Sequence, residues 1–143
     1  MIYFAHPMGT YNSKVEKRCI EMIKAHFNVK DSEIINPNSE RVVNALNLLR
    51  SKASLRSVMV FFYLLIDLCD TVVFLTYSDN SIGIGVWGEV KYATESYPDM
   101  PIFKLDLKND KIVSQTLDEL LDHKLLTMDE TVEANKIPRK NYR

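Results

Sequence analysis

Glu89 is the residue of this sequence best placed to do chemistry, because it follows a glycine-rich turn at the start of a helix-compatible stretch. It belongs to the segment SIGIGVWGEVKYA, residues 81–93, which comes soon after the apolar run TVVFLT, residues 71–76. One interpretation is structural, since the helix macrodipole stabilises an acid in the first turn by about 0.3–1 kcal/mol. The other is functional, because apolar surroundings tune a carboxylate as a nucleophile or an acid. The apolar neighbours are Val86, Trp87, Val90 and Ala93.

The glycines before Glu89 favour an anionic ligand. Gly83 and Gly85 allow the backbone to approach a ligand closely and to adopt a positive φ. A helix that begins near Gly85 directs free N–H groups to the same place. The pair lacks the full G-x-G-x-x-G and does not follow the first predicted strand, which disfavours a dinucleotide site. The turn therefore favours an anionic or sugar-phosphate ligand.

Other polar residues each have a structural alternative. His6 follows an apolar strand and either contacts a ligand or satisfies a turn, and Tyr3 on that strand is by default part of the core. Asp67 and Asp70 flank a helix end, where they cap or hydrogen-bond the turn. The three histidines lack the spacing of metal ligands, so no metal site is predicted.

Length and composition predict a single domain over residues 1–143. The chain is 46% hydrophobic and 26% charged, with a net charge of -1, which gives no basic field for a nucleic-acid polymer or a membrane surface. The longest apolar run, residues 58–66, is far shorter than the ~20 residues of a membrane span, and no signal peptide is evident. Cys19 and Cys69 are predicted to be buried thiols in a reducing compartment, so we expect a cytoplasmic protein.

Strand and helix patterns alternate along the chain. Strands are expected at residues 2–5, 32–37, 70–76 and 101–107. Helices are expected at residues 14–27, 40–49, 55–69, 85–95 and 116–122, and the capping-box sequence TMDE, residues 127–130, opens a last helix. This order predicts an α/β fold with a parallel sheet and helices on both faces. Ligands of such sheets bind outside the carboxyl ends of the strands, where the polar segments 6–13, 36–40 and 78–85 are expected to meet.

Four short motifs in this order resemble the nucleoside 2-deoxyribosyltransferase-like superfamily. They are IYFAHPMG (2–9), IINP (34–37), CDTVVFL (69–75) and GVWGEVKYA (85–93). The superfamily includes deoxyribosyltransferases and nucleoside 5'-monophosphate N-glycosidases, and the resemblance covers about residues 2–105. It implies a flavodoxin-like (Rossmann-like) three-layer sandwich with a mainly parallel sheet of about four or five strands. It also implies cleavage of an N-glycosidic bond without a cofactor or a metal.

The resemblance assigns roles to individual residues. Glu89 matches the catalytic glutamate of the family, which attacks or stabilises the anomeric carbon, and Tyr3 matches a tyrosine that lies close to it. Residues 5–13 match the loop that holds the sugar or its 5'-phosphate. The substrate-binding residues implied are Ala5, His6, Met8, Gly9, Thr10, Asn12, Ser13, Ser81, Gly83, Gly85 and Trp87.

Two positions depart from the family pattern. Relatives often carry a second carboxylate upstream of the aspartate matched by Asp70, and we place that position at Tyr63; Asp67 substitutes for it only if the helix is shifted. Monophosphate hydrolases tend to have a serine where this chain has Gly83, and Ser81 lies two residues further upstream. Both departures concern substrate and activity rather than fold.

Three functions remain in competition. The first is an N-glycosidase (hydrolase) acting on a nucleoside 5'-monophosphate, favoured because the first loop resembles a phosphate cradle. The second is a transferase that exchanges bases between deoxynucleosides, and the third is a nucleotide-binding or sensing module without catalysis, which the missing carboxylate supports. Each has a small-molecule nucleoside or nucleotide as its partner. A homodimer or higher homo-oligomer is also expected, because relatives complete their sites with residues of a neighbouring subunit, and residues 58–66 are a candidate interface as well as core.

Overall fold

The computed structural model describes residues 1–51 and 55–136. Its strands are β1 (Ile2–Ala5), β2 (Ile34–Ile35), β3 (Thr71–Phe74), β4 (Ile102–Asp106) and β5 (Lys111–Ser114). Its helices are α1 (Lys14–Phe27), α2 (Glu40–Arg50), α3 (Leu55–Asp67), α4 (Ile84–Ser96), α5 (Leu117–Leu121) and α6 (Met128–Lys136), with short 3-10 turns η1 (Met8–Thr10) and η2 (Asp31–Glu33).

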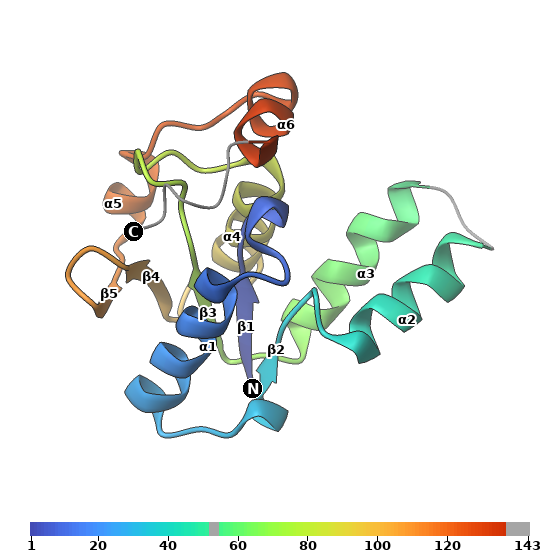
Figure 1. The fold of residues 1–143 in the computed structure, drawn as a ribbon, viewed down its shortest axis with the longest axis horizontal. Helices are drawn as coiled ribbons and strands as arrows, with labels where there is room; N and C mark the ends of the chain where they lie inside the picture. The colour runs from blue at the N-terminus through green and yellow to red at the C-terminus, as the bar shows by residue number, and fades with distance from the viewer. Residues whose placement is uncertain (52–54, 137–143) are drawn as a thin grey trace.

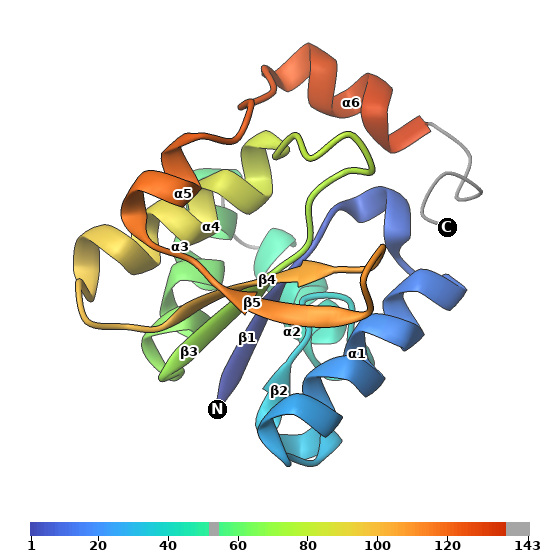
Figure 2. The same ribbon diagram turned by 90° about the vertical axis from the view of Figure 1, so that its left-hand side faces the viewer.

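The strands form one sheet in the order β2-β1-β3-β4-β5. β2, β1, β3 and β4 are parallel, and β5 pairs antiparallel with β4. The chain builds outward from β1 first to β2 and then, on the other side, to β3, so the loops that follow β1 and β3 leave the same edge of the sheet in different directions (Figures 1 and 2). In open parallel sheets, such a switch point is where ligands bind.

Side chains of successive strand residues divide between two apolar clusters. Tyr3, Ala5, Val72 and Phe74 belong to one cluster, together with residues of α2, α3 and α4. Ile2, Phe4 and Val73 belong to the other, together with residues of α1. The alternation of strand side chains explains this division, and each fully buried large apolar side chain stabilises the fold by about 1.5–3 kcal/mol. Consequently Tyr3 and the helix that carries Glu89 share one side of the sheet.

The expected order of strands and helices agrees with the structure, with local differences. The strand expected at residues 32–37 is reduced to the two residues of β2, because η2 occupies residues 31–33. The hairpin strand β5 was not predicted, since its residues are half-buried or exposed and carry no strong apolar alternation. The capping box of TMDE is confirmed: Thr127 Oγ1 accepts from the Glu130 amide at 3.2 Å, and the Thr127 amide donates to Glu130 Oε1 at 3.1 Å.

Candidate functional site

Glu89 lies in the second turn of α4, because the helix begins at Ile84. The first turn of α4 contains no acidic residue, so the macrodipole interpretation of Glu89 is wrong. The turn before the helix differs from the expectation as well. No glycine among the described residues has a positive φ, and Gly83 is the N-cap with a φ of -68°. Asn80, with a φ of 70°, supplies the left-handed residue of this turn, a conformation that asparagine tolerates better than most residues.

Glu89 and Tyr3 form an electrostatically unusual pair. Burial raises the pKa of Glu89 to about 8, and the nearby Tyr3 hydroxyl offsets part of that rise. Burial, followed by the charge of Glu89, raises the pKa of Tyr3 well above its usual value. Tyr3 is completely buried, and its hydroxyl has no hydrogen-bond partner among the described residues. The two groups are thus close enough to influence one another without forming a hydrogen bond of ordinary geometry.

Helix α3 packs beside this pair. A Cβ atom added at Gly88 would lie 3.7 Å from Met59 Cε and 3.8 Å from Tyr63 Oη. Tyr63 stacks on Tyr92 with ring centroids 4.3 Å apart. The Tyr63 phenol therefore lies against α4, beside the residue that precedes Glu89.

Asp67 and Asp70 are placed away from Glu89. Asp67 accepts hydrogen bonds from the hydroxyls of Tyr92 and Tyr97, both at 2.7 Å, so it is committed to the C-terminal half of α4. Asp70 is exposed and lies 3.5 Å from the amino group of Met1. Both aspartates therefore make their contacts with groups other than Glu89.

His6 is held inside the protein by groups of its own chain. Its Nε2 lies 2.8 Å from Glu16 Oε2 and its Nδ1 lies 3.2 Å from the Phe4 carbonyl oxygen. The ring is also stacked on Phe4, with centroids 4.1 Å apart. Both ring nitrogens are therefore occupied, and His6 acts here as a link between β1 and α1.

Glu16 gathers two of the three polar segments that the sequence analysis expected at this edge. Asn38 Nδ2 donates to both carboxylate oxygens of Glu16, at 3.0 and 3.2 Å, and to Asn12 Oδ1 at 3.0 Å. Burial acts to raise the pKa of Glu16, but the hydrogen bonds with His6 and Asn38 outweigh it and lower that pKa overall. The segments 6–13 and 36–40 are thus brought together, as predicted, by a hydrogen-bond network centred on Glu16.

The hydroxyls of the first loop point to its own backbone. Thr10 Oγ1 donates to the Pro7 carbonyl oxygen at 2.7 Å, and Ser13 Oγ donates to the Thr10 carbonyl oxygen while it caps α1. Met8 projects into solvent and Ala5 is completely buried. Among these predicted ligand-binding residues, Gly9 differs, because its N–H donates to Asn135 Oδ1 of α6 at 3.2 Å.

The loop between β3 and α4 is similarly ordered. The Ser81 amide and hydroxyl donate to Asp79 Oδ1 at 3.0 and 2.6 Å, and these bonds lower the pKa of Asp79. A Cβ atom at Gly83 would lie 3.1 Å from Tyr77 Oη and 3.3 Å from Thr131 Cγ2, which explains the glycine there. Gly85 faces open space, and Trp87 is half-buried against the core.

Four residues at this edge were missed by the sequence analysis. Burial and the charge of Glu89 raise the pKa of Tyr11, whose ring lies 4.9 Å from that of His6. Tyr77 donates through its hydroxyl to Asn135 Oδ1 at 2.7 Å, and Thr131 Oγ1 accepts from the Ile84 amide at 3.0 Å. Tyr11 stands within a segment already predicted to bind ligand, whereas the α6 residues carry no local signal of a site.

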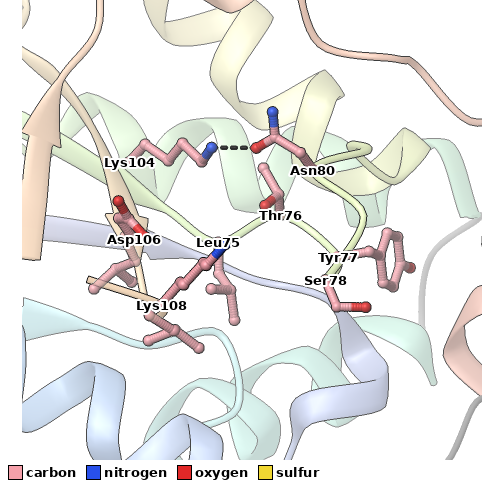
Figure 3. Close-up of a pocket in the computed structure, with 10 residues that line it drawn as sticks. Leu75, Thr76, Tyr77, Ser78, Asn80, Lys104, Asp106 and Lys108 are labelled. Atoms are coloured by element: carbon pink, nitrogen blue, oxygen red, sulfur yellow. Dashed lines mark hydrogen bonds between the residues drawn. The ribbon is translucent and has the colours of Figure 1, made fainter. Parts of the chain in front are cut away.

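A cavity of about 400 Å³ lies at the carboxyl ends of β3 and β4 (Figure 3). It is lined by neither Glu89 nor Tyr3, although Tyr77 contributes to its wall. Lys104 projects along it and donates to Asn80 Oδ1, and burial lowers the pKa of Lys104. The Asn80 carbonyl oxygen also accepts from His123 Nδ1 at 3.0 Å. These contacts hold the turn before α4, so we assign the cavity wall a structural role and place the candidate site at Glu89.

Within residues 1–51 and 55–136, no group of three or more His, Cys, Asp or Glu side chains is arranged to hold a metal ion. The helices described there are all too short or too polar to cross a membrane. No protein-family model matches the chain, and no curated protein or solved structure matches it either.

Proposed function

We propose that this protein cleaves the N-glycosidic bond of a nucleoside 5'-monophosphate, with Glu89 as the nucleophile or as the stabiliser of the positive anomeric carbon. The observation that carries the proposal is the Glu89–Tyr3 pair: a carboxyl group with its pKa raised to about 8 beside a buried hydroxyl without a partner among the described residues. The four sequence motifs support it, as does the strand order around the β1–β3 switch point. We further propose that the whole fold is the flavodoxin-like three-layer sandwich.

The chemistry requires Glu89 in its ionised form. As the bond from C1' to the base nitrogen breaks, its electron pair goes to the base, which takes up a proton, and positive charge develops at C1' and the ring oxygen. The carboxylate either bonds to C1' or stabilises this charge until water adds. Because the pKa of Glu89 is raised to about 8 in the free protein, we expect kcat/KM to increase with pH up to about pH 8.

Donors at the same edge fit the phosphate of such a substrate. The Gly9 and Ile84 amides both face α6 from the two loops that flank the switch point. The Ile84 amide stands at the N-terminus of a 13-residue helix, where the dipole favours anions. This arrangement supports a monophosphate over a free nucleoside, and hence a hydrolase over a transferase.

A sensor without catalysis is the second candidate. It is favoured by Tyr63, a phenol rather than a carboxylate, lying against the helix next to Glu89. Under this alternative, nucleotide binding would raise the melting temperature without consumption of the nucleotide.

A homodimer is part of the proposal. Helix α3 exposes Val60 and Leu64, one helical turn apart, and Leu68 follows just beyond the helix with 66% exposure. Successive turns place these side chains on one face, and α2 and α3 project from the side of the molecule (Figure 1). A second copy packed on this stripe would bury it.

The test is a base-release assay with matched variants. The wild type, Glu89→Gln and Glu95→Gln are incubated with ribo- and deoxynucleosides and their 5'-monophosphates, and free base is measured by chromatography. Glu95 is an exposed glutamate of the same helix, so its substitution controls for the loss of a charge on α4. We expect release from monophosphates by the wild type and by Glu95→Gln, and a loss of about a thousandfold or more in Glu89→Gln.

Each other outcome contradicts the proposal in a defined way. Full activity of Glu89→Gln removes Glu89 from the mechanism. Release that needs an added acceptor base indicates the transferase. No release, together with a higher melting temperature in one nucleotide, indicates the sensor.

A further inference from the structure

Helix α6 covers the carboxyl edge of the sheet, where it lies across the loops that follow β1 and β3 (Figure 2). None of its residues is buried, and the two large apolar ones, Met128 and Val132, are 60% and 46% exposed. A helix normally docks through an apolar face. The attachment of α6 therefore depends on polar contacts, which places it among the elements that open most easily.

Those contacts are made to donors of the candidate site. Asn135 Oδ1 accepts from the Gly9 amide at 3.2 Å and from the Tyr77 hydroxyl at 2.7 Å. Thr131 Oγ1 accepts from the Ile84 amide at 3.0 Å. Three donors from separate segments thus converge on two neutral side-chain oxygens that lie one helical turn apart.

The space around Asn135 is shaped for this contact. A Cβ atom at Gly9 would lie 3.0 Å from the Asn135 backbone oxygen and 3.3 Å from its Oδ1, so only glycine allows the helix to come this close. At this edge the Gly9 and Ile84 amides are therefore both occupied by side chains of α6.

The chain just before α6 is anchored independently. Ile82 forms a parallel bridge with Leu125, in which the Ile82 amide donates to the Lys124 carbonyl oxygen and the Leu126 amide donates to the Ile82 carbonyl oxygen, both at 2.9 Å. Release of the three side-chain contacts would leave this bridge intact. Leu126 is held by this bridge, so a movement of α6 would pivot at Thr127.

We propose that α6 is a displaceable lid whose Asn135 and Thr131 oxygens compete with an oxyanion for the Gly9, Tyr77 and Ile84 donors. All three donors offer hydrogen and the two lid oxygens act as acceptors, so the ligand group that replaces them is one rich in acceptors, such as a phosphate. That the phosphate belongs to a nucleotide rests on the proposed function, whereas the lid itself does not.

Phosphate titration of lid variants tests the proposal without any turnover. Inorganic phosphate is titrated into four proteins: the wild-type chain, the double variant Thr131→Val with Asn135→Ala, Asn135→Asp, and Val132→Thr. Amide chemical shifts are followed by NMR. Val132→Thr is a neutral, shape-conserving change at an exposed site of the same helix, so it is the matched control. Amide hydrogen exchange of α6 is measured with and without phosphate.

The expected pattern has opposite signs in the two lid variants. The double variant removes the competitor, so it should bind phosphate about tenfold more tightly. Asn135→Asp supplies a charged and stronger acceptor, so it should bind phosphate several-fold more weakly, while Val132→Thr matches the wild type. Phosphate should shift the Gly9 and Ile84 amides and accelerate exchange in α6.

Three results would overturn the lid proposal. They are equal phosphate affinity in all four proteins, no phosphate binding at all, and unchanged amide hydrogen exchange of α6 when phosphate binds. Failure of the proposed function would look different. In that case base release is absent while the phosphate affinities still follow the lid variants.

Discussion

Glu16 and Glu89 are two shielded glutamates of one fold whose pKa values move in opposite directions. Glu16, in the first turn of α1, is 7% exposed and has a lowered pKa because His6 and Asn38 outweigh the effect of burial. Glu89, in the second turn of α4, has its pKa raised to about 8 because burial is opposed only by Tyr3. The comparison shows that hydrogen-bond partners, and not burial alone, decide whether the ionised form of a carboxyl group is favoured in the folded protein.

The difference separates a structural acid from a candidate reactive one. Glu16 has its hydrogen bonds complete and joins β1, α1 and the segment before α2. Glu89 lacks such partners, so its carboxyl group is available to a ligand that develops a positive centre. The following predictions would break or sharpen this contrast.

Glu89→Gln should have the largest effect on stability, and it should be stabilising at high pH. The folded pKa of Glu89 is raised above its unfolded value, so the folded state holds more protons between about pH 4.5 and 8 and the wild type loses stability as pH rises through that range. The variant lacks this loss, and its free energy of unfolding at pH 9 should exceed that of the wild type by about 2–4 kcal/mol. Urea denaturation at pH 4.5, 7 and 9 measures this, and a constant difference across pH would contradict it.

Glu16→Gln should have the opposite sign and a slightly smaller size. The pKa of Glu16 is lowered in the folded state, so its stabilisation is present above the unfolded pKa and is lost as pH falls through the folded pKa. At pH 7 the variant should be less stable by about 2 kcal/mol, because it weakens charge-assisted bonds to His6 and Asn38. Urea denaturation extended to pH values below 4.5, where the folded pKa of Glu16 lies, should show the stabilities of the variant and the wild type converging. A deficit of the variant that persists there would mean that packing, not charge, was lost.

Tyr3→Phe should have the smallest effect on stability and a distinct effect on titration. The Tyr3 hydroxyl is buried without a partner among the described residues, so its removal should change the free energy of unfolding by less than about 1 kcal/mol. The hydroxyl also holds down the pKa of Glu89, so carboxyl NMR of the variant should find that pKa higher than in the wild type. An unchanged pKa of Glu89 in the variant would show that the Tyr3 hydroxyl does not influence the ionisation of Glu89.

Local sequence patterns were sufficient for the element order apart from β5, and for part of the site. The apolar periodicity of residues 14–27, the capping box at Thr127 and the runs that became β1 and β3 each depend on neighbours along the chain, so they were predictable. The meeting of segments 6–13 and 36–40 followed from the rule that parallel strands share a carboxyl edge. The departures were also local in origin: the helix began one residue earlier than expected, and Asn80 rather than glycine made the turn.

The sequence by itself determined which faces are apolar, where the chain turns and at which edge the polar loops gather. Only the tertiary structure decided which polar groups pair there: Asn38 with Glu16, Asn135 with Gly9 and Tyr77, and Tyr3 with no partner among the described residues. The physical reason is that periodicity specifies the direction in which a side chain points, whereas a hydrogen bond between distant segments requires a separation fixed to within tenths of an ångström by packing. The raised pKa of Glu89 and the polar docking of α6 both depend on such separations, which only the tertiary structure fixes.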